Sequence, residues 1–401
     1  MRLLFIHEVN WKTKPIFEIH DYPELLSLRG HDVYFLDFPE GEKLRSFFKL
    51  DNFRTKITIN SSRAHKGSSV EVITPGRVCG SPLDRLLHSV TFVPLLLKTV
   101  HRTKCEAIVL YGIPTNGWQT IIIAKMLSIP VLLRVIDVSH KLRKSKFQRL
   151  VVFAEKFVYK QSKTISVNNE SLRYHCVNFG ANDENISVDY PGLDLERFKP
   201  ETANLGLKTS LGFNASDKII LFLGTLYRFA GLSRFLELID ETLKLDAHLK
   251  VLIIGDGESR LKIKETILRL NLENQVVMTG FIKYEELSNY LNLADIAINT
   301  FDPSLVTDSA LPWKVVQYLA CGLPTISTPL RGLMAYTGDK SDAIIYRCLD
   351  STFVDAIDEL IKNRALQGSL SINARELVAR KSNWSDCIVR FEELLTSLVA
   401  Y

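Results

Sequence analysis

The 401-residue sequence has few of the features that mark secreted, metal-stapled or membrane-spanning proteins. Its six cysteines are scattered, with no Cys-x-x-Cys pair and no histidine at zinc-finger spacing, so we expect reduced thiols and no metal site. The opening apolar run, "LLFI", is too short for a signal peptide, and the more apolar stretch "VTFVPLLLKTV" is interrupted by Pro94 and Lys98. These absences lead us to expect a cytoplasmic protein.

The formal net charge of +5 conceals a strongly basic segment in the first half of the chain. Residues 43–163 contain 22 basic and 6 acidic side chains. Within it, the stretch "HKLRKSKFQRLVVFAEKFVYKQSK" places Phe147, Phe153, Phe157 and Tyr159 among the bases. Such a segment is either a solvated face or a binding surface for anionic lipid, a phosphorylated acceptor or nucleic acid. Nucleic acid is the least favoured partner, because no nucleic-acid-binding motif accompanies the charge.

Short β-rich runs alternate with helical patterns along the whole chain, which is typical of βαβ units with parallel sheets. The first series runs from "RLLFIHE" to "NISVDYP", and the second from "KIILFLGT" to "AIIYRC". The least periodic segment, residues 196–217, separates them. The sequence therefore predicts two doubly wound, Rossmann-like α/β domains that bind ligands at the carboxyl ends of their strands.

Three strand ends in the second series have features of a nucleotide pocket. "LIIGDGES" places Gly255 after one strand, and "QVVMTGF" places Gly280 after the next. "LPWKVVQYLACGLPTIST", residues 311–328, reads as a helix followed by a strand, with Pro312 at the first helical position and Gly322 at the helix end. Free N–H groups at a helix start form an anion site, so we expect a phosphate group near Pro312.

These motifs also carry a family resemblance. In order and spacing, "GTLYRFAGLSRFLELI", the stretch from "LIIGDGES" to "LNLADIAI", and "LPWKVVQYLACGLPTIST" resemble the retaining glycosyltransferases of family 4, which have the GT-B fold. The resemblance implies two domains facing across a cleft. Residues 1–198 with a C-terminal helix at 384–401 would bind the acceptor, and residues 199–383 would bind the nucleotide sugar.

The implied activity is that of a retaining hexosyltransferase. It would move a sugar from a nucleotide diphosphate donor to a lipid-linked or glycan acceptor, without a cofactor. The chain contains no Asp-x-Asp motif to hold a metal, so we expect no metal. In the second domain, Arg228 and Lys314 would stabilise the leaving diphosphate, and in the first domain Asp137 and His140 would contact the donor sugar. The expected donor-binding residues are Gly224, Gly255, Phe281 and Ile282 beside the base, Asp308, Ser309, Ala310 and Leu311 at the helix start, and Gln317.

The chain departs from the family at charged positions. Ser309 and Gln317 stand where the family carries two glutamates, although Asp308 lies beside the first of them. Thr225 and Ala230 replace the usual arginine and lysine, and the loop "EVNWKTKPIFEIH" lacks the usual glycines. An alternative therefore stays open: a non-catalytic glycosyltransferase-like partner subunit that keeps the fold.

We further expect the first domain to work at the inner face of the cell membrane. The bases are densest from Lys141 to Lys163. Each base near an anionic headgroup layer contributes up to about 1 kcal/mol, so a few of them give reversible, peripheral attachment. A lipid-linked acceptor would then reach the cleft without leaving the membrane.

Overall fold

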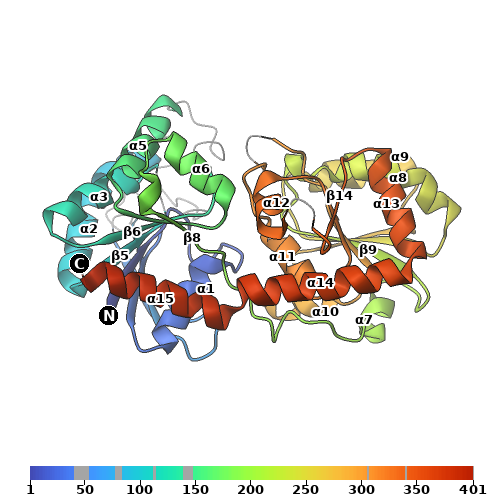
Figure 1. Cartoon of the computed structure of the whole chain (residues 1–401), viewed down its shortest axis with the longest axis horizontal. Helices are drawn as coiled ribbons and strands as arrows, with labels where there is room; N and C mark the ends of the chain where they lie inside the picture. Colours follow the sequence, from blue (N-terminus) through green and yellow to red (C-terminus); the bar gives the residue numbers. More distant parts are fainter. Residues whose placement is uncertain are drawn as a thin grey trace. The chain divides into compact units, whose positions relative to one another are not determined.

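The computed structural model describes residues 1–39, 54–76, 84–111, 114–138, 148–304, 307–338 and 341–400. The chain divides into two compact units, each with its own sheet (Figure 1). Unit 1 comprises Met1–Pro191 and the residues from Ser385 onward, and unit 2 comprises Gly192–Trp384. The first boundary thus falls at Pro191, whereas the sequence placed it at residue 198. Both units are Rossmann-like α/β structures, which confirms the predicted fold class.

Unit 1 contains an eight-stranded sheet in the order β3-β4-β2-β1-β5-β6-β7-β8. Neighbouring strands are parallel, except that β3 is antiparallel to β4. The strands are β1 Arg2–Ile6, β2 Asp32–Leu36, β3 Lys56–Ser61, β4 Val70–Thr74, β5 Ala107–Leu110, β6 Val131–Val135, β7 Thr164–Val167 and β8 Ile186–Val188. All but β3 match the apolar runs of the sequence. The edge strand β3 is exposed over most of its length, so its sequence needs no apolar run.

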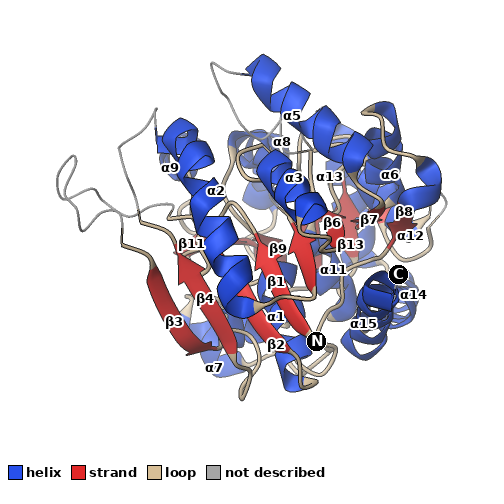
Figure 2. Ribbon diagram, turned by 90° about the vertical axis from the view of Figure 1, so that its left-hand side faces the viewer, coloured by secondary structure: helices blue, strands red, loops and turns tan. Residues whose placement is uncertain are grey.

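Helices cover both faces of the unit 1 sheet. They are α1 Glu18–Leu28, α2 Asp84–Thr103, α3 Gly117–Met126, α5 Gln148–Gln161, α6 Glu170–Asn178 and α15 Trp384–Ala400. Figure 2 shows α2, α3 and α5 side by side over one face. The C-terminal helix α15 packs on α1, where the rings of Tyr22 and Phe391 stack with centroids 4.1 Å apart. Glu392 of α15 also accepts hydrogen bonds from Arg29 and His31.

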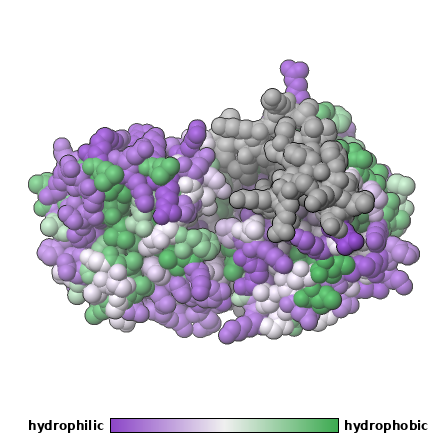
Figure 3. Space-filling view, turned by 180° about the vertical axis from the view of Figure 1, so that it is seen from behind, coloured by the Kyte–Doolittle hydropathy of each residue, from purple (hydrophilic) through white to green (hydrophobic). Residues whose placement is uncertain are grey.

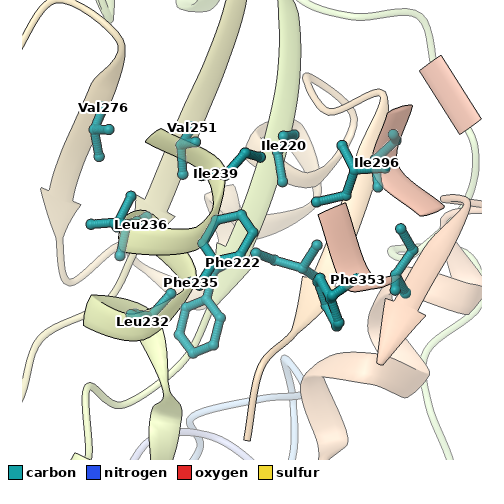
Figure 4. Close-up of a cluster of buried hydrophobic side chains, with 14 of the residues drawn as sticks. Ile220, Phe222, Leu232, Phe235, Leu236, Ile239, Val251, Val276, Ile296 and Phe353 are labelled. Carbon is teal, nitrogen blue, oxygen red and sulfur yellow. The ribbon is translucent and has the colours of Figure 1, made fainter. Parts of the chain in front are cut away.

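Unit 2 contains a six-stranded, all-parallel sheet in the order β11-β10-β9-β12-β13-β14. Its strands are β9 Lys218–Leu223, β10 Leu249–Ile254, β11 Val276–Gly280, β12 Ile296–Asn299, β13 Thr325–Ser327 and β14 Ile345–Tyr346, each within a run that the sequence marks as a strand. Its α-helices are α7 Leu205–Ser210, α8 Leu232–Leu245, α9 Arg260–Leu270, α10 Leu287–Leu291, α11 Trp313–Ala320, α12 Arg331–Thr337, α13 Ser351–Lys362 and α14 Arg364–Ser382. Figure 4 shows part of the core, where Phe222 of β9 lies with Phe235 of α8 and Phe353 of α13.

The helix expected near Pro312 is α11, with two differences. It begins at Trp313, because Pro312 is its N-cap residue, with an extended ψ of 110°. It spans 8 residues, which is shorter than expected, and Gly322 follows it with a left-handed φ of +66°. All of its residues after Trp313 are buried, including Lys314 and Gln317. A polar side chain on this helix is therefore enclosed by protein, so the groups that it contacts determine its charge state and its role.

Candidate functional site

The carboxyl ends of β9, β10 and β11 meet at three glycines in unit 2. The Gly224 N–H donates to the Ile254 carbonyl at 2.9 Å, and the Gly255 N–H donates to the Gly280 carbonyl at 2.8 Å. A Cβ atom on Gly255 would lie 2.0 Å from the Gly224 carbonyl oxygen. Gly224 and Gly255 also have positive φ angles, +135° and +134°. The close backbone approach by itself requires glycine at residue 255, whether or not a ligand binds there.

Helix α11 is fixed against this edge by Tyr318. Its hydroxyl accepts a hydrogen bond from the Leu223 N–H, at 2.6 Å, at the end of β9. One turn earlier on the helix, Lys314 therefore lies beside Gly224. A Cβ atom on Gly224 would be 3.5 Å from Lys314 Cδ and 3.8 Å from Lys314 Nζ. The missing side chain of Gly224 leaves the space next to the ammonium group open.

The Lys314 ammonium occupies an aromatic cage, formed by the rings of Phe222 and Phe301. Its Nζ lies 3.7 Å from the centroid of Phe222 and 3.9 Å from that of Phe301. Lys314 is 8% exposed, and Nζ has no hydrogen-bond partner within the described residues. Burial lowers the pKa of this ammonium well below its usual value. The site is thus a buried amine whose charged form two ring faces stabilise but no described anion neutralises.

The loop before α11 is tied to α12. Asp308 accepts hydrogen bonds from the backbone N–H of Arg331, at 3.1 Å, and from its Nε, at 2.5 Å. The Ala310 N–H donates to the Thr307 carbonyl at 2.9 Å, so in this conformation the group is used within its own loop. Leu311 is buried, Ser309 is half-buried, and Pro312 makes no side-chain cap on the helix.

Comparison with known proteins finds similarity to glycosyltransferases. Residues 207–377 match the family described as Glycosyl transferases group 1. The chain is 28% identical over 368 residues to a 2-deoxystreptamine N-acetyl-D-glucosaminyltransferase of Niallia circulans, covering 90% of this chain and 86% of that one. An uncharacterized glycosyltransferase of Methanocaldococcus jannaschii is 20% identical over 234 residues, which is 57% of this chain and 58% of the relative's own length.

Among solved structures, Anabaena Alr3699/HepE in complex with UDP and glucose is similar over 99% of this chain and 100% of its own, with a TM-score of 0.74 and 16% identity. These similarities support a GT-B glycosyltransferase. The GT-B fold is the one predicted from the sequence, and the matched family domain lies within unit 2, where Lys314 and the three glycines are.

The other residues expected at the glycosyltransferase donor site are less closely grouped. Arg228 lies in a short 3-10 helix after β9, with its side chain 83% exposed and its Nε 3.9 Å from Glu258. Phe281 is 71% exposed and Ile282 half-buried after β11. In unit 1, Asp137 is half-buried after β6, and His140 lies outside the described residues. Within the described part of the chain, no group of three or more His, Cys, Asp or Glu side chains is arranged to hold a metal ion.

The glycine-free loop after β1 holds its shape through side chains, which sequence reasoning missed. Trp11 is fully buried against Phe35, with ring centroids 4.6 Å apart, and its backbone N–H donates to Asp37 at 3.1 Å. Arg63 donates to the Lys14 carbonyl at 2.7 Å. Burial lowers the pKa of neighbouring His20 to about 3, so this imidazole is neutral. The aromatic residue inside a polar loop, "NWKTK", was the available signal.

A cavity of about 880 Å³ lies elsewhere in unit 1, at the amino-terminal ends of β6 and β7. Residues from the end of α3, the starts of these strands and the end of α15 line it. Ligands of doubly wound sheets bind at the opposite, carboxyl edge. This cavity is therefore distinct from the candidate site of unit 2.

Proposed function

We propose that this protein is a retaining hexosyltransferase that uses a nucleotide diphosphate sugar and needs no metal. In the reaction the bond between the anomeric carbon and the diphosphate oxygen breaks, and a bond to an acceptor hydroxyl oxygen forms. The acceptor proton leaves with the products. The single observation that carries the proposal is the caged Lys314 ammonium beside Gly224, since a diphosphate is the kind of anion that such a buried cation lacks.

In this scheme the positive charge of Lys314 stabilises the diphosphate as negative charge develops on it. The amino-terminal end of α11 adds its dipole and the Leu311 N–H. Gln317, three residues after Lys314, would accept one hydrogen bond from the ribose diol through its amide oxygen. Arg228 follows Gly224 in the loop after β9 with its side chain exposed, and would leave Glu258 to pair with the bound donor.

For the donor base and the acceptor we propose a chemical class only. The UDP present in the Anabaena structure makes a uridine nucleotide the first choice, stacked near Phe281 and Ile282. Unit 1 would bind a lipid-linked or glycan acceptor, with Asp137 and His140 facing the sugar. The protein would act in the cytoplasm at the membrane surface. No helix in the described part of the chain is long and apolar enough to cross a bilayer.

The second candidate function is a non-catalytic partner subunit. Ser309 and Gln317 favour it, as does the engagement of Asp308 with Arg331, which would have to break before that carboxylate could replace the missing glutamate. Against it stand Lys314, the glycines and the start of α11, which together would bind a diphosphate.

Isothermal titration of the full chain with UDP, ADP and GDP tests the proposal. We expect one of them to bind with the same affinity before and after addition of EDTA. Loss of binding in EDTA would remove metal independence, and no binding by any of the three would remove the donor site. Transfer of the sugar to water or to a sugar acceptor is then followed by NMR of the anomeric proton. Transfer distinguishes an active enzyme from a non-catalytic subunit, and the NMR signal shows whether the anomeric configuration is retained.

A further inference from the structure

Three consecutive helices of unit 1 share one outer surface. The chain passes from β4 through α2 to β5, through α3 to β6, and through α5 to β7, always in the same direction along the sheet. Right-handed crossovers place all three helices on the same face, as Figure 2 shows. This outer face, defined by the exposed residues of α2, α3 and α5, is solvent-accessible in the structure.

The outer face exposes large apolar side chains at helical spacing. Trp118, Ile122 and Met126 follow each other four residues apart along α3, exposed by 37%, 39% and 78%. Figure 3 shows apolar patches along the edge of the molecule to which α2 and α3 project. Among the described side chains, the set is Val90 and Leu97 on α2, Trp118, Ile122, Met126 and Leu127 at α3, and Leu150 and Phe153 on α5. A soluble protein seldom exposes so many neighbouring apolar side chains without a partner.

The described charges on the outer face have one sign. Its exposed bases are Lys98 and Arg102 on α2, Lys125 on α3, and Arg149, Lys156 and Lys160 on α5. Among the described side chains of these three helices, the only acid is Glu155, and it is buried. Arg102 pairs with Glu71 of β4, and the rest of the set forms no salt bridge within the described residues. Apolar side chains set among bases complement an anionic lipid surface rather than water alone.

We propose that the outer face of α2, α3 and α5 docks on an anionic membrane surface, with the apolar side chains inserted at the headgroup boundary and the bases beside lipid phosphates. This assignment corrects the sequence interpretation that the aromatics between residues 141 and 163 do so. Tyr159 is fully buried and Phe157 is half-buried against the core, so Phe153 is the one described aromatic of that stretch that is largely exposed. The apolar contribution comes mainly from α2 and α3.

The inference deepens the proposed function, since a membrane-bound acceptor would be presented to unit 1, but the docking itself needs no donor. Sedimentation of the full chain with phosphatidylcholine vesicles, with and without phosphatidylglycerol, tests it across a salt series. We expect binding only to the anionic vesicles and a loss of binding as salt increases. Fluorescence of Trp118 should shift to shorter wavelength on binding, and a Trp118→Phe variant should lose the shift.

Two variants and one control make the test specific. Lys125→Gln with Lys160→Gln should lower vesicle affinity about 25-fold, at roughly fivefold for each base. Ile122→Ser with Met126→Ser should lower it by a similar or larger factor. The control pair Leu261→Ser and Lys262→Gln is equally exposed on α9 of unit 2 and should change nothing.

Unchanged nucleotide affinity in every variant shows that they are folded and that the donor site is intact. Absence of wild-type binding to anionic vesicles at low salt would overturn the proposal. So would an equal loss in the α9 control, or equal binding to uncharged vesicles. Failure of nucleotide binding with intact vesicle binding would instead remove the proposed function and leave the docking surface.

Discussion

Replacing Lys314 by methionine isolates the charge of this side chain, because methionine keeps an unbranched apolar stem within the aromatic cage. In the free protein the change removes an ammonium that has no hydrogen-bond partner among the described residues. Burying an unpaired charge costs several kcal/mol, of which cation–π contacts with desolvated rings return about 2 kcal/mol or more. We therefore expect Lys314→Met to raise the free energy of unfolding by about 1–3 kcal/mol at neutral pH.

The lowered pKa of Lys314 also predicts the direction in which stability changes with pH. Because the pKa of Lys314 is lower in the folded protein than in the unfolded chain, the unfolded chain binds more protons between the two values. The stability of the wild type should then rise with pH toward the usual lysine pKa of about 10.4. The difference in free energy of unfolding between Lys314→Met and the wild type should therefore decrease over the same pH range. Urea unfolding followed by circular dichroism at several pH values measures both effects.

Donor binding should favour the wild type, although Lys314→Met is expected to be the more stable protein without the donor. The diphosphate supplies the missing anion, so Lys314→Met should lose about 2 kcal/mol or more of binding free energy, at least about 30-fold in affinity. The bound anion also raises the pKa of the ammonium, so binding should take up protons and weaken as pH rises. Calorimetry with a nucleotide sugar in two buffers of different ionisation enthalpy detects this uptake.

A matched control is Lys262→Met on the exposed surface of α9, which should alter neither stability nor affinity. If Lys314→Met is less stable than the wild type and binds the donor equally well, then Lys314 only fills space. That result would remove the observation on which the proposed function depends.

Arg228→Ala should lower kcat more than it raises KM, since charge on the diphosphate grows as the sugar leaves, and a change confined to KM would contradict this role. Gln317→Glu should tighten nucleotide binding about fivefold through a charge-assisted ribose contact, and calorimetry with a 2′,3′-dideoxynucleotide should show no gain. Gly255→Ala should destabilise the protein by about 3 kcal/mol or more, because its Cβ would lie 2.0 Å from the Gly224 carbonyl oxygen. Gly338→Ala, with a φ of +93° but no atom within 4 Å, should cost only about 1–2 kcal/mol in thermal unfolding, and equal losses at both positions would refute the steric argument.

The sequence by itself determined the two sheets, because each buried parallel strand is a continuous apolar run that a local pattern records. It also located α11 through Gly322 and placed Lys314 at the start of that helix. It could not find β3, since an exposed edge strand carries no such run. Nor could it place the first helical residue, because Pro312 fits the N-cap and the first helical position equally well at the level of sequence.

Only the tertiary structure decided what surrounds each functional candidate. Phe222 lies one residue before the end of β9, Phe301 follows β12 and Lys314 is the second residue of α11, so the aromatic cage exists only once parallel pairing brings these segments together. The tertiary structure also decided that the Ala310 N–H is used within its own loop. It likewise decided that most of the exposed apolar side chains near the bases of residues 141–163 lie on α2 and α3. Periodicity along the chain fixes which residues are buried, but the charge, partners and exposure of a polar side chain depend on contacts that are distant in sequence.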